Sequence, residues 1–260
     1  MVDAVMFDID GVLTVSWEPV PGAADAVQAV RDRGLDVAFV TNTTSRAAAS
    51  VAGSMRDAGI DLRDDELLTA TVATATHLRD RHHGATCLVL NDGDTGDDLA
   101  HLCIAEPPDT AQVVVVGGAG PTFSYDALDD AFRALANGAR FVAMHRNLRW
   151  RTSRGEQLDA GAFVLGLEAA TGVEATVVGK PAAAFFRAGL DIVGGEAGRT
   201  LMIGDDLHSD VLAAQQLGCR GVLVRTGKFR HEDLEDPAGS PDHVIDSVAD
   251  LPGLLDQLSG

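Results

Sequence analysis

The sequence predicts an α/β protein in which a doubly wound, mostly parallel sheet forms the core and a smaller α/β domain is inserted into it. Short apolar runs alternate with amphipathic segments of helix length, which is typical of such a sheet. Several of the apolar runs end in polar or acidic residues, where parallel sheets bind ligands. The alternation restarts after residue 80, with enough strands for a separate sheet. We therefore expect residues 1–80 and 178–260 to form the core, and residues 81–177 the inserted domain.

The first apolar run ends in Asp8-Ile9-Asp10-Gly11. In a strand, residues two positions apart face the same way, so Asp8 and Asp10 project together. Two carboxylates this close repel each other unless a cation or a shared proton lies between them. Mg²⁺ is a suitable cation, because one or two carboxylates and the oxygens of a phosphate hold it. An ordinary solvated Asp-Gly turn is the alternative, and this segment alone leaves both open.

The other elements follow from helical spacing, strand-like runs and glycine stops. In the core we expect helices over residues 21–33, 46–58, 65–79, 182–193, 211–217 and 248–258, and strands over 35–40, 200–203 and 221–224. In the inserted domain we expect strands over residues 85–90, 112–116 and 141–144, and helices over 96–102, 124–136 and 160–171. Ser124 is a suitable N-cap for the second of these helices.

Composition excludes some classes of function. The net charge of −19 argues against a nucleic acid or an anionic membrane as partner, because both repel such a surface. No apolar run is long enough to span a membrane, and the N-terminus lacks a leader pattern. The three cysteines have no metal-ligand spacing, and we expect reduced thiols. These features predict a cytoplasmic protein that binds neither nucleic acid nor membrane.

Four polar groups share one predicted placement, at or just after the carboxyl end of a buried strand. They are Asp8 with Asp10, Thr41 with Asn42, Lys180, and Asp205 with Asp206 and Asp210. Each has a plain structural alternative. This is a helix N-cap for Thr41-Asn42, a solvated turn for Asp8 with Asp10, an exposed turn for Lys180 and a capped turn for Asp205-Asp206. In this order, however, they match what phosphoryl transfer through an aspartyl-phosphate requires. Lys228, the only other lysine, we expect to be a solvated loop residue.

At these residues the chain resembles the haloacid dehalogenase (HAD) superfamily. The insertion between the second and third motifs is similar to that of the type IIA capped, NagD-like subgroup. The segments 177–181, 202–206 and 224–230, with Phe123-Ser124-Tyr125, are similar to the branch that contains phospholysine phosphohistidine inorganic pyrophosphate phosphatase. The resemblance covers essentially the whole chain. It implies a HAD-like Rossmannoid core and a Mg²⁺-dependent phosphohydrolase of small phosphorylated metabolites.

The resemblance, together with the chemistry, also assigns roles. Asp8 is the expected nucleophile, and Asp10 the acid that protonates the leaving oxygen and the base that activates water. The Asp8 carboxylate, the Asp10 carbonyl and Asp205 are expected to hold Mg²⁺. The predicted phosphoryl-binding groups are the Thr41 hydroxyl, the Asn42 N–H and the Lys180 ammonium. Asp206 and Asp210 are expected to orient metal-bound waters and Lys180. The second aspartate favours phosphate substrates over halides, because a departing halide needs no proton.

In this subgroup the inserted domain covers the active site and supplies specificity. His145 and Arg146 are the candidate substrate contacts here, although many relatives carry Asn-x-Asp at that place. The resemblance further implies a homodimer. Two other functions stay open, a phosphotransferase or phosphomutase on the same scaffold and a non-catalytic metabolite-binding protein. The complete set of Asp8, Asp10, Lys180 and Asp205 argues against the last, since a pure binder needs no second aspartate to move protons.

Overall fold

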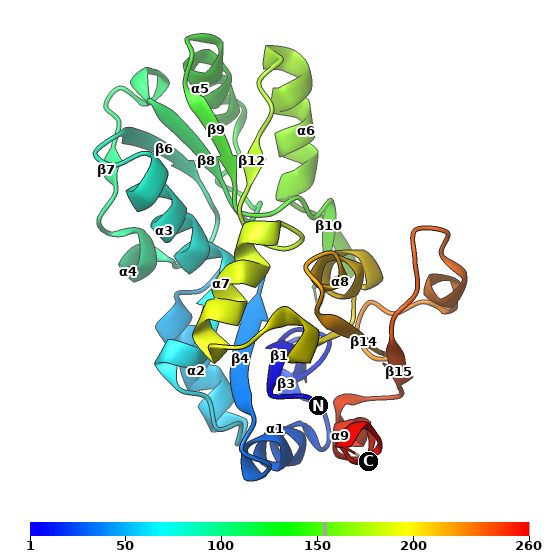
Figure 1. Cartoon of the computed structure of the whole chain (residues 1–260). Helices are drawn as coiled ribbons and strands as arrows, with labels where there is room; N and C mark the ends of the chain where they lie inside the picture. The colour runs from blue at the N-terminus through cyan, green and yellow to red at the C-terminus, as the bar shows by residue number, and fades with distance from the viewer. Residues whose placement is uncertain (153–154, 260) are drawn as a thin grey trace. The chain divides into compact units, whose positions relative to one another are not determined.

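A computed structural model describes residues 1–152 and 155–259 of the chain. The chain forms two compact units (Figure 1). The core unit consists of Met1–Thr41, Ala49–Leu68 and Lys180–Gly260, and the inserted unit of Asn42–Ala48 and Thr69–Gly179. The division from the sequence, by comparison, places residues 42–48 and 69–80 with the core.

The core unit is built on a six-stranded sheet with the order β15-β14-β13-β1-β4-β5. Its strands are β1 (Ala4–Asp8), β4 (Asp36–Thr41), β5 (Leu67–Thr69), β13 (Thr200–Gly204), β14 (Arg220–Val224) and β15 (His243–Ile245). The four pairings from β15 to β4 are all parallel. Every residue of β1 and of β13 is buried, as expected for strands in the middle of a parallel sheet.

The order of the strands creates a switch point in the middle of this sheet. From β1 the chain moves outward on one side to β4 and β5, and it later returns to place β13, β14 and β15 on the other side. Connections therefore leave β1 and β13 in opposite directions. Ligands of open α/β sheets bind at the carboxyl ends of such strands. Asp8 is the last residue of β1, and Asp205 directly follows β13.

The helices of the core unit are α1 (Ala23–Asp32), α2 (Ala48–Asp57), α7 (Ala183–Val193), α8 (Ala213–Gln215) and α9 (Leu251–Ser259). Helix α7 packs closely on the sheet because Gly189 has no side chain. A Cβ atom there would lie 2.9 Å from Met6 Sδ and 3.4 Å from Val40 Cγ1. The helix predicted over residues 65–79 is partly wrong. Residues 67–69 form β5 instead, and α3 (Ala70–Arg81) begins after them with Thr69 as its N-cap.

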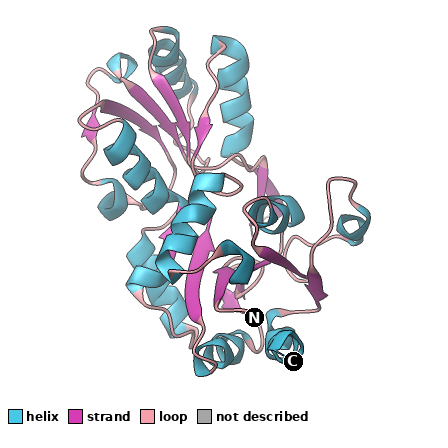
Figure 2. Ribbon diagram, in the orientation of Figure 1, coloured by secondary structure: helices cyan, strands magenta, loops and turns pink. Residues whose placement is uncertain are grey.

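The inserted unit has its own sheet, whose strands are magenta in Figure 2. It has five strands in the order β12-β9-β8-β6-β7. The strands are β6 (Thr86–Leu90), β7 (Cys103–Ile104), β8 (Val113–Val116), β9 (Arg140–Ala143) and β12 (Thr176–Val177), all paired in parallel. Its helices are α3, α4 (Gly96–Leu99), α5 (Tyr125–Ala136) and α6 (Ala160–Thr171). Ser124 caps α5 as predicted, accepting a hydrogen bond from the Ala127 N–H.

Alternation along β8 explains why helices cover both faces of this sheet. Val114 and Val116 pack in one apolar cluster with residues of α5 and α6. Val113 and Val115 belong to a second cluster with residues of α3. A uniformly apolar strand thus contributes side chains to two hydrophobic clusters, one on each face of the sheet, because successive side chains point to opposite faces.

Two antiparallel hairpins were not predicted from the sequence. They are β2 (Thr14–Val15) with β3 (Glu18–Pro19), and β10 (Arg149–Thr152) with β11 (Gly155–Leu158). Ser16 and Trp17, which join β2 to β3, both have positive φ angles, as a two-residue hairpin turn of the favoured type requires. Among the described residues, none of the helices has the length and apolar character needed to cross a membrane.

Candidate active site

Asp8 lies at the buried end of β1 and Asp10 at the surface just beyond it. The Ile9 N–H donates to Asp8 Oδ1 over 2.8 Å, and the Ser16 N–H donates to Asp10 Oδ1 over 3.3 Å. Gly11 then turns the chain with a φ of +97°. A Cβ atom on Gly11 would lie 1.9 Å from Asp205 Oδ2, so only glycine lets this loop approach that carboxylate.

The second acidic segment follows β13. The Asp206 side chain caps the π-helix Leu207–Leu212 by accepting hydrogen bonds from the N–H groups of His208 and Ser209. That turn carries Asp210 back toward the strand end, where its Oδ2 accepts the Asp206 N–H over 3.2 Å. The helix predicted from residue 211 therefore begins earlier, and its wide first turn is what places Asp210 in the site. π-turns of this kind are common at functional sites.

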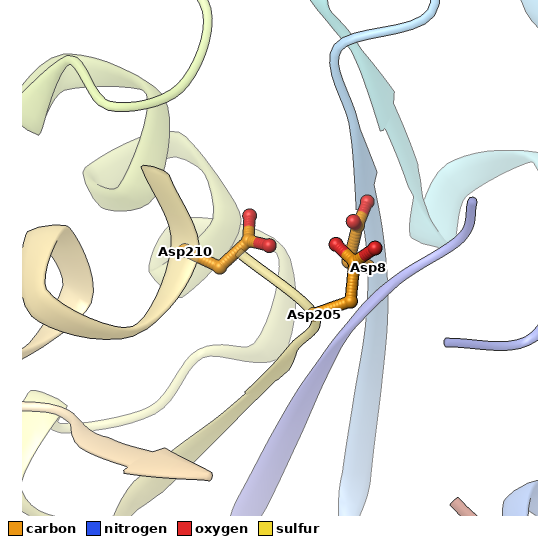
Figure 3. A group of neighbouring side chains, drawn as sticks. All are labelled: Asp8, Asp205 and Asp210. Carbon is orange, nitrogen blue, oxygen red and sulfur yellow. The ribbon is translucent and has the colours of Figure 1, made fainter. Parts of the chain in front are cut away.

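Three buried carboxylates point toward one another at this place, those of Asp8, Asp205 and Asp210 (Figure 3). One oxygen of each lies within 4.8 Å of the others. Burial, together with the neighbouring negative charges, raises the pKa of Asp205 well above its usual range. Burial likewise raises the pKa of Asp210, to about 6, although Lys180 acts in the opposite direction. Such crowding is unfavourable unless a cation relieves it.

Lys180 supplies part of that positive charge. Its Nζ lies 2.7 Å from Asp8 Oδ1 and 2.6 Å from Asp210 Oδ1, and only 4% of its side chain is exposed. Burial lowers the pKa of this lysine, but the charges of Asp210 and Asp8 outweigh burial and raise it to about 12. Lys180 is thus a charged residue inside the site. The exposed turn considered as an alternative for Lys180 is not what the structure shows.

Lys228 also lies at the site, which sequence reasoning missed. Its side chain is half exposed, at 53%, as a loop lysine should be. Its Nζ nevertheless lies 4.0 Å from Asp205 Oδ1 and 3.9 Å from Asp206 Oδ2, and its N–H donates to Asp205 Oδ2 over 2.7 Å. Burial lowers the pKa of Lys228, but the charge of Asp205 and of the other aspartates raises it above its usual range. The scarcity of lysine in this chain was the one signal that could have found it.

The residues present fit a hard divalent cation. Asp205 Oδ1 is buried and accepts no hydrogen bond from any described residue, which is costly unless another ligand occupies it. Asp8, Asp205, Asp206 and Asp210, when ionised, exceed the charges of Lys180 and Lys228 by two. Carboxylate oxygens are the ligands that Mg²⁺ prefers. Asp210 lies inside this carboxylate cluster, whereas the sequence placed it outside the set of metal ligands.

Thr41 is buried at the end of β4, one residue beyond Val40, which is the register partner of Asp8. Because α2 begins only at Ala48, Thr41 and Asn42 are not its N-cap, and that alternative is wrong. Thr41 therefore belongs to the core unit and lies at the same edge of the sheet as Asp8. Asn42 is the first residue of the inserted unit.

His145 and Arg146 follow β9 in the inserted unit. His145 is buried, and its Nδ1 accepts the Asn147 N–H over 3.3 Å. The Arg146 guanidinium forms an ion pair with Glu168 of α6. Arg146 therefore already has an anionic partner within this unit, so a substrate anion would have to compete with Glu168.

Comparison with protein families gives two matches along the chain. Residues 5–120 match the haloacid dehalogenase-like hydrolase family, and residues 177–251 match a HAD-hydrolase-like family. The Bos taurus protein named haloacid dehalogenase-like hydrolase domain-containing protein 2 is 37% identical over 252 residues, covering 94% of this chain and 95% of its own. The Rattus norvegicus phospholysine phosphohistidine inorganic pyrophosphate phosphatase is 33% identical over 260 residues, with 98% and 94% covered.

Solved structures are also similar to this chain over nearly its whole length. NagD from the E. coli K-12 strain is 31% identical, with a TM-score of 0.84 over 95% of this chain and 97% of that one. A p-nitrophenyl phosphatase from Archaeoglobus fulgidus is 29% identical, with a TM-score of 0.89 over 97% of this chain and 99% of that one. Likeness of this extent covers both compact units.

Proposed function

Since the chain belongs to the haloacid dehalogenase-like hydrolase family and is a NagD-like member of it, we propose that it is a Mg²⁺-dependent phosphohydrolase of small phosphorylated molecules. The observation that carries the proposal is the buried cluster of Asp8, Asp205 and Asp210, with the ammonium of Lys180 between Asp8 and Asp210. A carboxylate nucleophile, cations to offset its charge and a buried Asp205 oxygen that accepts no hydrogen bond from any described residue suit phosphoryl transfer with a metal ion.

Asp8, Asp205 and the carbonyl of Asp10 are the proposed metal ligands, and the position of Asp210 makes it a further candidate. Bound Mg²⁺ would offset the repulsion between the carboxylate nucleophile and the anionic substrate. A metal held by buried carboxylates of one sheet edge is kept in a fixed place relative to the nucleophile, which favours in-line attack.

Asp8 is the proposed nucleophile. One of its carboxylate oxygens forms a bond to phosphorus while the bond from phosphorus to the leaving atom breaks, an oxygen in an ester or pyrophosphate and a nitrogen in a phosphoramidate. Asp10 gives its proton to that leaving atom and then takes a proton from the water that hydrolyses the aspartyl-phosphate. The exposure of Asp10 suits this role, because that carboxyl group must exchange protons with water and reach the leaving group. The Ser16 N–H holds the Asp10 side chain at the sheet edge.

The transferring phosphoryl oxygens gain negative charge and need donors that are already in place. We assign the Lys180 ammonium, the Thr41 hydroxyl and the Asn42 N–H to them. The Lys180 ammonium contacts both Asp8 and Asp210, which supports this assignment because it lies directly beside the proposed nucleophile. Asp210 is then the anchor of Lys180, and Asp206 is the cap that shapes the turn carrying Asp210.

For the substrate we propose a small phosphate monoester, a phosphoramidate or inorganic pyrophosphate. The name of the rat relative includes a phosphoramidate and inorganic pyrophosphate, and that of the Archaeoglobus fulgidus protein includes the phosphate monoester p-nitrophenyl phosphate. A panel of p-nitrophenyl phosphate, phosphohistidine, phospholysine and pyrophosphate, assayed with and without Mg²⁺, tests the proposal. We expect phosphate release that requires Mg²⁺ and is lost in Asp8→Asn.

The same panel separates hydrolysis from phosphotransfer. With added alcohols, a hydrolase releases one phosphate for each leaving group, whereas a phosphotransferase produces phosphorylated alcohol in place of phosphate. No phosphate release from any member of the panel, with Mg²⁺ present, would contradict the proposed activity.

A further inference from the structure

The loop after β14 brings a second lysine to the acidic cluster through the turn Thr226-Gly227-Lys228. The Thr226 hydroxyl donates to the Gly11 carbonyl, joining this turn to the loop that follows β1. Gly227 has a φ of +61°, and a Cβ atom on it would lie 2.0 Å from Asp205 Oδ2. The turn can therefore approach Asp205 this closely only because Gly227 has no side chain.

Lys228 lies near Asp205 with two different groups, its backbone N–H and its side-chain ammonium. Its N–H donates to Oδ2 over 2.7 Å, which fixes the orientation of the carboxylate. Its ammonium lies 4.0 Å from Oδ1, beyond hydrogen-bond distance, and no other described residue donates to that oxygen. One residue thus directs Asp205 Oδ1 into the cluster while placing a positive charge near it.

The two lysines of the chain are held differently. Lys180 is within 2.7 Å of two carboxylates and 4% exposed, so moving it would bury unpaired charges. Lys228 is 53% exposed and keeps about 4 Å from its acidic neighbours, 4.0 Å for Asp205 and 3.9 Å for Asp206. A long, half-exposed side chain can turn its ammonium toward water at little cost in free energy. Of the two lysines, Lys228 is therefore the one whose ammonium a divalent metal ion can displace from Asp205.

We propose that Lys228 is a positioning residue that acts as the resident counter-ion of Asp205 and sets the affinity of the site for Mg²⁺. Its ammonium offsets the negative charge of Asp205 and Asp206 before the metal binds and competes with the metal for that charge. Its backbone N–H keeps Asp205 oriented in both states. The inference rests on the proposed Mg²⁺ site and adds the residue that limits how tightly the site binds.

The test is the dissociation constant of Mg²⁺, measured by titration calorimetry at pH 8 on the full chain. We expect Lys228→Met to bind Mg²⁺ about three- to tenfold more tightly than wild type, because one competing charge at the surface is removed. Lys228→Arg should stay within about twofold, since the charge remains. Arg225→Met is the matched control, because Arg225 lies in the same loop but pairs with Asp246.

The difference between Lys228→Met and wild type should shrink between about 0.02 M and 0.5 M salt, because screening weakens exposed charges. Lys228→Gln serves as a second variant if Lys228→Met does not fold. Equal or weaker Mg²⁺ binding by the neutral variants, with normal binding by wild type, overturns this inference and leaves the metal site intact. Equal tightening in Arg225→Met overturns it too, as a general charge effect. Absence of Mg²⁺ binding by wild type overturns both this inference and the proposed metal dependence.

Discussion

The two sheets of this protein share an architecture but differ in what lies at their carboxyl ends. In the core unit, Asp8, Asp205 and Asp210 meet there as buried carboxylates with an excess of negative charge. In the inserted unit the corresponding polar side chains are satisfied locally. Asn91, after β6, accepts the Gly118 N–H and donates to the Thr44 carbonyl. Asp159, which lies between β11 of the two-stranded sheet and α6, accepts the N–H groups of Ala160 and Ala119.

The difference teaches that a parallel sheet offers a place for a site but does not create one. A strand-end carboxylate that accepts backbone N–H groups is a structural cap, as Asp159 is for α6. A strand-end carboxylate that faces other carboxylates needs a ligand. Within the residues that the structure describes, the acidic group suited to a metal lies in the core unit.

The largest expected effect comes from removing the nucleophile. Asp8→Asn should lower kcat by about 10³-fold or more, because an amide cannot attack phosphorus. The matched control is Asp92→Asn, two residues after β6 of the inserted sheet, where we expect less than about a threefold change. Phosphate release from p-nitrophenyl phosphate measures both. Losses of similar size in the two variants would abolish the contrast between the sheets.

The next effect concerns the glycine that lets the first loop approach Asp205. Gly11→Ala should weaken Mg²⁺ binding and lower kcat by about 100-fold, because the new Cβ would lie 1.9 Å from Asp205 Oδ2 and displace it. Gly34→Ala is the control. Gly34 also has a positive φ, of +70°, but nothing lies within 4 Å of its Cβ position. That variant should lose only about 1 kcal/mol of unfolding free energy, measured with urea, and bind Mg²⁺ normally.

A smaller effect should appear in the pH dependence of the metal-free protein. Because the pKa of Asp210 is about 6 when folded and ordinarily 3.8, the folded state binds more protons than the unfolded state between these values. The contribution of Asp210 to stability is then present at low pH and lost as pH rises from about 4 to 6. Urea unfolding of wild type and Asp210→Asn across this range, without Mg²⁺, measures it. A wild-type slope that Asp210→Asn does not reduce would contradict the assignment.

The affinity for Mg²⁺ should depend on pH in the opposite direction and increase as the pH rises, because Mg²⁺ binds the ionised carboxylates. We expect the affinity for Mg²⁺ to fall by up to about tenfold for each pH unit below about 6, since a proton must leave for each metal bound. Calorimetry in buffers of different ionisation enthalpy would detect the released proton. An affinity that is constant from pH 5 to 7 would show that the cluster is already ionised.

The smallest effect is expected in the inserted unit. Asp159→Ala and Ser124→Ala each remove a helix N-cap and should cost about 1 kcal/mol of unfolding free energy. Neither should alter the dissociation constant of Mg²⁺. A weaker metal affinity in Asp159→Ala would contradict the assignment of the metal site to the core unit alone.

Much of this protein follows from short-range sequence patterns. The α/β fold and membership of the hydrolase family are confirmed, and α1, α5 and α6 lie within two residues of their predicted bounds. The roles of the site residues stay predictions. The errors fall where local pattern is weak. Three residues suffice for β5, and hydrogen bonding to β4 decides that they are extended.

The sequence alone determined which residues are the candidates for the chemistry, because acids and a lysine recur at the ends of its apolar strands in an order that phosphoryl transfer would require. The family resemblance already implied that Asp210 orients Lys180, but only the tertiary structure decided the other pairings. Nothing in the order of residues places Lys180 beside Asp8, or brings Lys228 to Asp205 from a loop 23 residues away. Those pairings depend on strand order. Electrostatic forces act over ångströms in space, and distance along the chain does not fix them.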